Sequence, residues 1–197
     1  MTARPTITRA ATRYTAMAIV LHWVIAVLIL INLVLVWFAD QWPKDWVRPA
    51  IDTHKSIGIT VLGLAIMRLL WRAINPPPPF PDGYPRWERF AAHAAHIALY
   101  ALIFAIPLSG WLHDSAWKGG PTHPDKLFWL IPWPRIPQIA HMAAVPKEHF
   151  HDALFAVHKA LAYVLYALFG LHVAAALKHQ WIDRQPELQR MLPGRRR

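Results

Sequence analysis

The stretch VHKALAYVLYALFGLHVAAALKHQWI, residues 157–182, decides the fold of this chain. No charged residue occurs between Ala160 and Leu177, and most side chains there are apolar. A helix needs roughly 20 such residues to cross the hydrocarbon core of a bilayer, which is about 30 Å thick. We therefore expect a membrane-spanning helix here, within a segment from about 150 to 178.

Two histidines, His158 and His172, lie within this predicted helix. The fourteen-residue step from one to the other turns an α-helix through about 1400°, roughly 40° short of four full turns, and advances it by about 21 Å. Both imidazoles therefore face the same way, one in each half of the membrane. Ionisable side chains are costly inside a membrane and usually serve a function. The spacing is the one that two stacked haems would need.

Three further segments are long and apolar enough to span a bilayer, at about 17–38, 54–74 and 90–112. Hydrophobic residues make up 55% of the chain and charged residues only 16%, less charge than a soluble domain usually carries. We therefore expect an all-α, integral membrane four-helix bundle with a single domain and a long outer loop at 113–149. The chain has no cysteine, which excludes thiolate haem ligation, iron–sulfur clusters and disulfide bonds.

The basic residues predict the orientation of the bundle. The formal net charge is +10, and Lys and Arg exceed Asp and Glu at both ends of the chain and in the second connection. Because cytoplasmic segments are enriched in Lys and Arg, we expect both termini inside the cell. The first and third connections then lie outside. Attraction to anionic headgroups accounts for the positive charge, so we expect no nucleic-acid partner. The terminal bases are Arg4, Arg9, Arg13, Arg190 and Arg195 to Arg197.

Depth in the membrane predicts which histidines pair. His22 lies near the inner end of the first segment and therefore matches His172, whereas His54 opens the second segment on the outer side and matches His158. Each pair could bind one haem iron through both axial positions. Bis-imidazole iron has no open position, which favours electron transfer. For any one histidine alone, a hydrogen bond between helices remains the alternative. Small residues stand four positions after the four histidines, where a haem edge needs room: Ala26, Gly58, Ala162 and Ala176.

Other side chains are weaker candidates for contacts with haem propionates or a substrate. Lys55 and Lys159 follow the outer histidines and could pair with propionates or attract an anionic substrate, or extend to the headgroups. His93 and His96 could bond to propionates of the inner haem, line a quinone or proton path, or be ordinary interfacial residues. Arg13, which precedes the first span, is the last candidate.

Several stretches resemble the prokaryotic cytochrome b561 family, and together they cover nearly the whole chain. They are RYTAMAIVLHW (13–23), HKSIGITVLGLAIMRLLWR (54–72), AHAAHIALYALIFAIPLSGW (92–111), the stretch 157–182 and the tail RMLPG (190–194). The resemblance implies a four-helix bundle with two haems b in the bacterial inner (cytoplasmic) membrane. The family's ligand positions match His22, His54, His158 and His172. The third connection here is longer than in compact members and could shield the outer haem or dock a periplasmic partner.

The resemblance also implies exchange of electrons with ubiquinone, and at least one kind of member oxidises superoxide. We therefore expect a diheme cytochrome that carries electrons between a periplasmic donor, with superoxide as one candidate, and the ubiquinone pool. One alternative is a non-catalytic electron-transfer subunit serving a periplasmic or peripheral redox protein. A haem-free transporter that uses its histidines for protons or metals is another.

Overall fold

Four long helices dominate the structure, a computed structural model that describes residues 13–80 and 83–192. They are α1 (Ala16–Trp37), α2 (Lys44–Ile74), α3 (Arg86–Ser115) and α5 (Ala144–Leu177), and a π-helical turn, η3 (Lys178–Ile182), continues α5. Each is long and apolar enough to cross a membrane, with a mean hydropathy of 1.7 to 2.9 in its most apolar part. The bases Arg4, Arg9 and Arg195 to Arg197 lie outside the described residues. The shorter elements are η1 (Ala39–Gln41), η2 (Gly120–Thr122), β1 (Lys126–Leu127), β2 (Ile131–Pro132), α4 (Pro137–Ala140) and α6 (Glu187–Met191).

Three helices extend beyond the apolar segments that the sequence marks. Helix α2 begins at Lys44 rather than near His54, and α5 begins at Ala144 rather than near 150. Helix α3 likewise runs past both ends of the segment 90–112. Hydropathy marks where a helix is apolar, not where its hydrogen bonding stops. In the polar extension of α2, Arg48 and Asp52 form an i,i+4 ion pair at 3.2 Å, a spacing that supports helix outside the hydrocarbon core.

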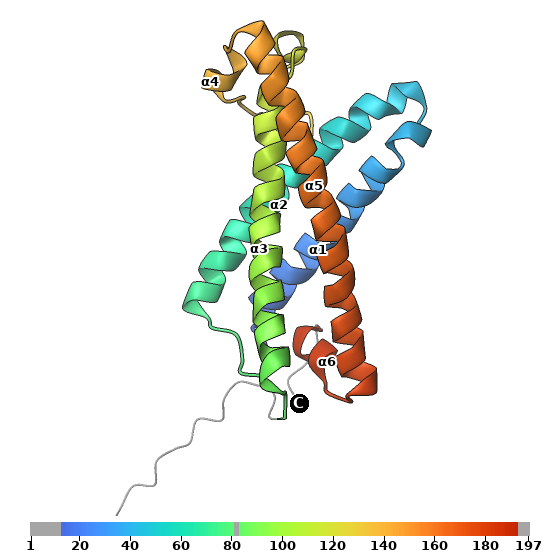
Figure 1. The fold of residues 1–197 in the computed structure, drawn as a ribbon, viewed down its shortest axis with the longest axis vertical. Helices are drawn as coiled ribbons and strands as arrows, with labels where there is room; N and C mark the ends of the chain where they lie inside the picture. The colour runs from blue at the N-terminus through green and yellow to red at the C-terminus, as the bar shows by residue number, and fades with distance from the viewer. Residues whose placement is uncertain (1–12, 81–82, 193–197) are drawn as a thin grey trace, which may run out of the picture.

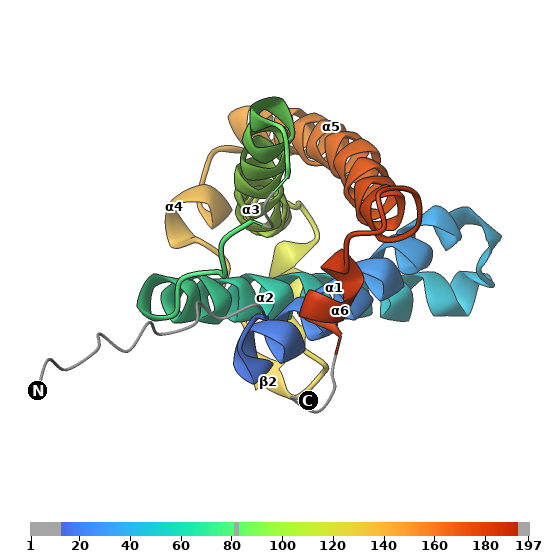
Figure 2. The same cartoon turned by 90° about the horizontal axis from the view of Figure 1, so that it is seen from below.

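The four helices form two layered pairs. Helices α3 and α5 run side by side, and α1 and α2 cross behind them at an angle (Figure 1). Seen along the long axis, the α1–α2 pair lies on one side and the α3–α5 pair on the other (Figure 2). A small core of Ile25, Ile57 and Val61 joins α1 to α2. Many large apolar side chains elsewhere on the helices are exposed, such as Leu70 and Leu171, as expected for surfaces that face lipid.

Both ends of the described chain meet at one end of the bundle, which we call the tail end. The backbone N–H of Tyr14 donates to the carbonyl of Arg190 at 3.4 Å, and the indole of Trp23 donates to the carbonyl of Met191 at 2.6 Å. Residues 116–143 connect α3 to α5 at the opposite end, which we call the loop end. The ends of the described chain therefore cover the tail end of the bundle, and the connection 116–143 covers the loop end.

Candidate functional site

The loop-end histidine pair joins α2 to α5. The ring centroids of His54 and His158 are 6.2 Å apart, and the ring planes are inclined at 83°. An iron atom held between two imidazoles by bonds of about 2 Å would separate the centroids by about 6 Å. The geometry therefore suits a metal bound between the two rings.

The tail-end histidine pair joins α1 to α5 with nearly the same geometry. The centroids of His22 and His172 are 6.3 Å apart at 76°. On α5 the two histidines are separated by about 21 Å of helix rise. The structure thus brings together both pairs that the depth argument matches, one near each end of the bundle.

Hydrogen bonding orients the ring of His158. Its Nδ1 atom lies 3.0 Å from the carbonyl oxygen of Ile106 on α3 and 3.1 Å from the hydroxyl of Ser109. Because a carbonyl can only accept, Nδ1 must carry the proton, which leaves Nε2 free to bind a metal. Gly110 faces the same ring, and a Cβ at that position would come within 3.2 Å of Cε1. Helix α3 therefore fixes the position of this imidazole by a hydrogen bond and by close packing, and we call this contact the seat on α3.

Two buried polar atoms near the other half of the loop-end pair have no hydrogen bond among the described residues. They are Nδ1 of His54 and Oδ1 of Asn32. Asn32 lies on α1 and faces α2 one turn from His54, since its amide nitrogen would be 3.9 Å from a Cβ at Gly58. Unsatisfied polar atoms are rare in the interior of a protein. Together with the seat on α3, they fit a site built for a polar prosthetic group such as haem.

The tail-end pair has two close polar neighbours. His96 lies beside His172, with ring centroids 5.5 Å apart. Arg68 donates to the carbonyl of Ala18 and to the hydroxyl of Tyr100 at 3.2 and 2.9 Å, so its guanidinium lies inside the bundle. There it acts electrostatically on His22, His96 and His172.

The other predicted contact residues lie in different surroundings. His93 is exposed and bonds to the carbonyl of Arg89 at 2.8 Å, so only His96 of the AHAAH motif approaches the tail-end pair. Arg13 bonds to the carbonyl of Leu192 at 2.5 Å. Lys159 is exposed, with its ammonium over the ring of Phe155.

Lys55 belongs to an ion cluster at the loop end. It pairs with Asp125, with Asp114 at 3.1 Å and with Asp52 at 3.4 Å. Arg135 pairs with the same two loop-side carboxylates, Asp114 at 3.2 Å and Asp125 at 2.6 Å. The cluster ties the connection 116–143 to α2, about three turns from its first residue, and to the end of α3. Burial and the neighbouring Asp114 raise the pKa of Asp125 to about 6.

Sequence reasoning missed this cluster and the inward position of Arg68. The available signal for Arg68 is a basic residue within an apolar segment, since ionisable side chains inside a membrane usually serve a function. The partners of Lys55 lie 59 and 70 residues away. No local pattern in the sequence predicts that pairing.

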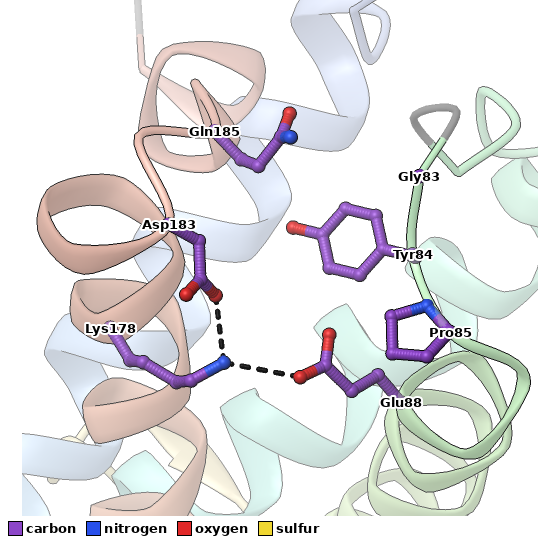
Figure 3. Close-up of a pocket in the computed structure, with 7 residues that line it drawn as sticks. All are labelled: Gly83, Tyr84, Pro85, Glu88, Lys178, Asp183 and Gln185. Atoms are coloured by element: carbon purple, nitrogen blue, oxygen red, sulfur yellow. Dashed lines mark hydrogen bonds and ion pairs between the residues drawn. The ribbon is translucent and has the colours of Figure 1, made fainter.

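A cavity of about 230 Å³ opens at the tail end between α3 and η3 (Figure 3). Lys178 lies between two carboxylates there, 3.1 Å from Glu88 and 2.7 Å from Asp183. Glu88, His179 and Asp183 have their ligand atoms within 4.8 Å of one another, as metal ligands would. Because the ammonium of Lys178 pairs with both carboxylates, the group acts as an ion-pair link between α3 and α5.

Comparisons with known proteins found a family model and individual relatives that match most of the chain. The family model described as prokaryotic cytochrome b561 matches residues 13–194. Cytochrome b561 homolog 2 of Escherichia coli is 35% identical over 183 residues, which cover 91% of each chain. The probable superoxide oxidase CybB of Yersinia pestis is 29% identical over 193 residues, 93% of this chain and 98% of the relative. Cytochrome b561 homolog 1 of Escherichia coli is 27% identical over 192 residues, 93% and 99% of the two chains.

Proposed function

Because the chain belongs to the prokaryotic cytochrome b561 family, we propose that it is a diheme cytochrome that carries electrons between a periplasmic donor and the ubiquinone pool. Membership makes the chain a bacterial membrane protein with b-type haem and a role in electron transfer. Our proposal goes beyond family membership in four respects: the number of haems, their ligands, the location in the inner membrane and the two redox partners.

The observation that carries the proposal is the presence of two facing histidine pairs. The ring centroids are 6.2 Å apart in one pair and 6.3 Å apart in the other. His54 and His158 would hold the loop-end haem, and His22 and His172 the tail-end haem. Haem b supplies reversible one-electron chemistry at its iron when it is bound. A histidine pair of this kind would hold the iron from both sides and so favour electron transfer over the binding of oxygen. All four histidines are half-buried between the helices.

The proposed orientation puts the tail end in the cytoplasm. Arg13, Arg68 and Arg72 cluster towards that end, and Lys and Arg are enriched on the cytoplasmic side of membrane proteins. The contact between Tyr14 and Arg190 places both ends of the described chain on the same side. The connection 116–143 then faces the periplasm, where the donor would approach the loop-end haem.

Superoxide is our first candidate for the donor, supported by the name of the relative from Yersinia pestis. Its negative charge would be attracted by basic side chains at the loop end. Lys55 is engaged by three carboxylates, so the exposed Lys159 is better placed to attract an anion.

A periplasmic redox protein is the second candidate donor, and the loop end itself favours it. The connection 116–143 is tied to α2 and to the end of α3 by Lys55 and Arg135. A cover held in this way limits direct access of small molecules and offers a surface to a partner. In that case the chain would be an electron-transfer subunit rather than an enzyme.

Redox-titrated absorption spectroscopy of the purified protein and of four His→Ala variants tests the proposal. We expect two haems b per chain in the wild type. His54→Ala and His158→Ala should each lose the same haem, and His22→Ala and His172→Ala the other. His93→Ala is the matched control and should keep both, because its ring is exposed. Loss of both haems in every variant, or a single haem in the wild type, would contradict the proposal.

Reduction by the two donors then separates the alternatives. Superoxide generated in solution should reduce the haems of the protein alone, and added ubiquinone should reoxidise them. If superoxide has no effect and a co-purified periplasmic protein is required, the chain is an electron-transfer subunit. If the haems also fail to exchange electrons with ubiquinone, the proposed acceptor is wrong.

A further inference from the structure

The β1–β2 hairpin carries the most exposed apolar cluster of the connection 116–143. Leu130 is 81% exposed, Ile131 61%, Trp129 56% and Phe128 41%. These residues are contiguous and form the tip of the hairpin, which is closed by a bond from Leu130 N–H to the carbonyl of Leu127 at 3.0 Å. A contiguous apolar cluster of this kind marks an interaction surface.

The backbone of the tip has a conformation that is strained for large side chains. Phe128 and Trp129 have φ angles of 49° and 62°, a region that glycine or asparagine normally fills in such a turn. Two bulky aromatic residues therefore occupy positions where glycine would be less strained. The choice of residue is explained if the aromatic rings make contacts outside the chain.

The hairpin is fixed against a membrane-spanning helix at a definite depth. The backbone N–H of Phe128 donates to the hydroxyl of Ser56 on α2 at 2.9 Å, and Ser56 is fully buried by this contact. From Ser56 to the end of α2 at Ile74, the helix rises by about 27 Å. This is close to the hydrocarbon thickness of about 30 Å. Because α2 crosses the bundle at an angle (Figure 1), a bilayer boundary near Ile74 would bring the hairpin to the opposite boundary or slightly inside it.

The hairpin also faces away from the rest of the protein. In Figure 2 the strand β2 lies on the side of the α1–α2 pair opposite to α3 and α5. The lipid-facing surface of α1 and α2 therefore continues onto the hairpin. Lys126, at the base of the tip, is exposed and suits the zone of phosphates, while tryptophan is typical of the membrane interface.

We propose that the hairpin tip, residues 128–131, inserts into the loop-side leaflet of the bilayer and anchors the connection 116–143 there. The tip would lie at the boundary between the lipid headgroups and the acyl chains. The tip is continuous with the lipid-facing helices, lies at bilayer depth, and combines aromatic and aliphatic side chains with a lysine at its base. The anchor also holds Asp125, the residue before β1, against Lys55 and hence next to His54.

Site-directed spin labelling tests the anchor, because the chain contains no cysteine. Leu130→Cys and Ile131→Cys, each labelled with a nitroxide in lipid nanodiscs, would be compared with Lys118→Cys in the same connection, where the side chain is 87% exposed. At positions 130 and 131 we expect strong collision with oxygen and a several-fold weaker collision with a water-soluble nickel complex than at position 118. An unchanged haem spectrum shows that each labelled variant is folded.

Two results would overturn the anchor. If labels at 130 and 131 meet the nickel complex as often as the label at 118, the tip is in water. If they are shielded from both oxygen and nickel, protein covers the tip, such as a second copy of the chain. Both readouts are independent of electron transfer, so failure of the anchor would leave the proposed function standing, and the reverse also holds.

Discussion

His158 is bonded through Nδ1 to the carbonyl oxygen of Ile106, 3.0 Å away on the neighbouring helix. The bond fixes the tautomer of the imidazole and leaves Nε2 as the only nitrogen that can bind a metal. It also sets the direction of the ring, which Gly110 supports from one side. The loop-end pair is therefore positioned in part by α3, a helix that carries neither of its two histidines.

Gly110→Ala should weaken the loop-end site specifically. The new Cβ would lie 3.2 Å from Cε1 of His158 and 3.4 Å from its Nδ1, so the ring must shift by a few tenths of an ångström. Forcing a side chain off its rotamer costs about 0.5–1.5 kcal/mol, and we expect up to roughly tenfold weaker haem retention at this site only. Haem content and electron paramagnetic resonance of the oxidised protein measure the effect. Gly170→Ala is the control, since no atom lies within 4 Å of its Cβ. Equal effects of both substitutions would contradict the seat.

Arg68→Gln should lower the reduction potential of the tail-end haem. A nearby positive charge disfavours the oxidised iron, so its removal favours that state. At about 10 Å and an effective dielectric constant of about 20, the interaction is about 1–2 kcal/mol, or roughly 40–90 mV for one electron. Potentiometric titration would show the shift. Tyr100→Phe removes a hydrogen-bond partner of Arg68 but keeps the charge, so its shift should be smaller. Equal shifts at both haems would show that the charge of Arg68 is not closer to the tail-end haem than to the loop-end haem.

The sequence predicted the pairing of histidines because the rule behind it is local. Helical phase and rise place His158 and His172 on one face at two depths, and antiparallel spans leave one partner for each. The positions that the sequence did not predict depend on contacts between distant segments. Lys55 meets Asp125 only because the connection 116–143 folds back over α2.

Ser56 and Ser115 show the same limit. Within a helix, a serine hydroxyl commonly donates to the carbonyl four residues earlier, and both do so here. That local bond is all that the sequence can indicate. In the structure each hydroxyl also accepts a backbone N–H from the connection 116–143, from Phe128 and Ile136 respectively. Both serines are thereby buried attachment points for the loop.

Ser56→Ala should therefore loosen the loop without changing the helices. The N–H of Phe128 would lose its partner, and an unsatisfied buried donor costs about 1–3 kcal/mol. We expect faster tryptic cleavage after Lys126 and a lower temperature of thermal unfolding. Thr60→Ala is the control, because the hydroxyl of Thr60 bonds within α2, to the carbonyl of Ser56. Similar cleavage rates in the two variants would show that the bond to Phe128 does not hold the loop.

The attachment of the loop should also depend on pH through Asp125. Burial and the nearby Asp114 raise the pKa of Asp125 to about 6 from the ordinary 3.8. A carboxyl whose pKa is raised on folding binds its proton more tightly in the folded state. Its contribution to stability therefore falls as pH rises through the window from about 4 to 6.

Asp125→Asn tests this dependence, because it removes the titrating group. Protease resistance of the loop, measured between pH 4 and 7, should decrease with rising pH more steeply in the wild type than in Asp125→Asn. Asp45→Asn is the control, since Asp45 is exposed on the first turn of α2, and it should keep the slope of the wild type. A wild-type slope that is zero, or that rises with pH, would mean that Lys55 and Arg135 keep the Asp125 carboxylate ionised throughout the window. In that case the ion cluster would hold the loop equally well at every pH from 4 to 7.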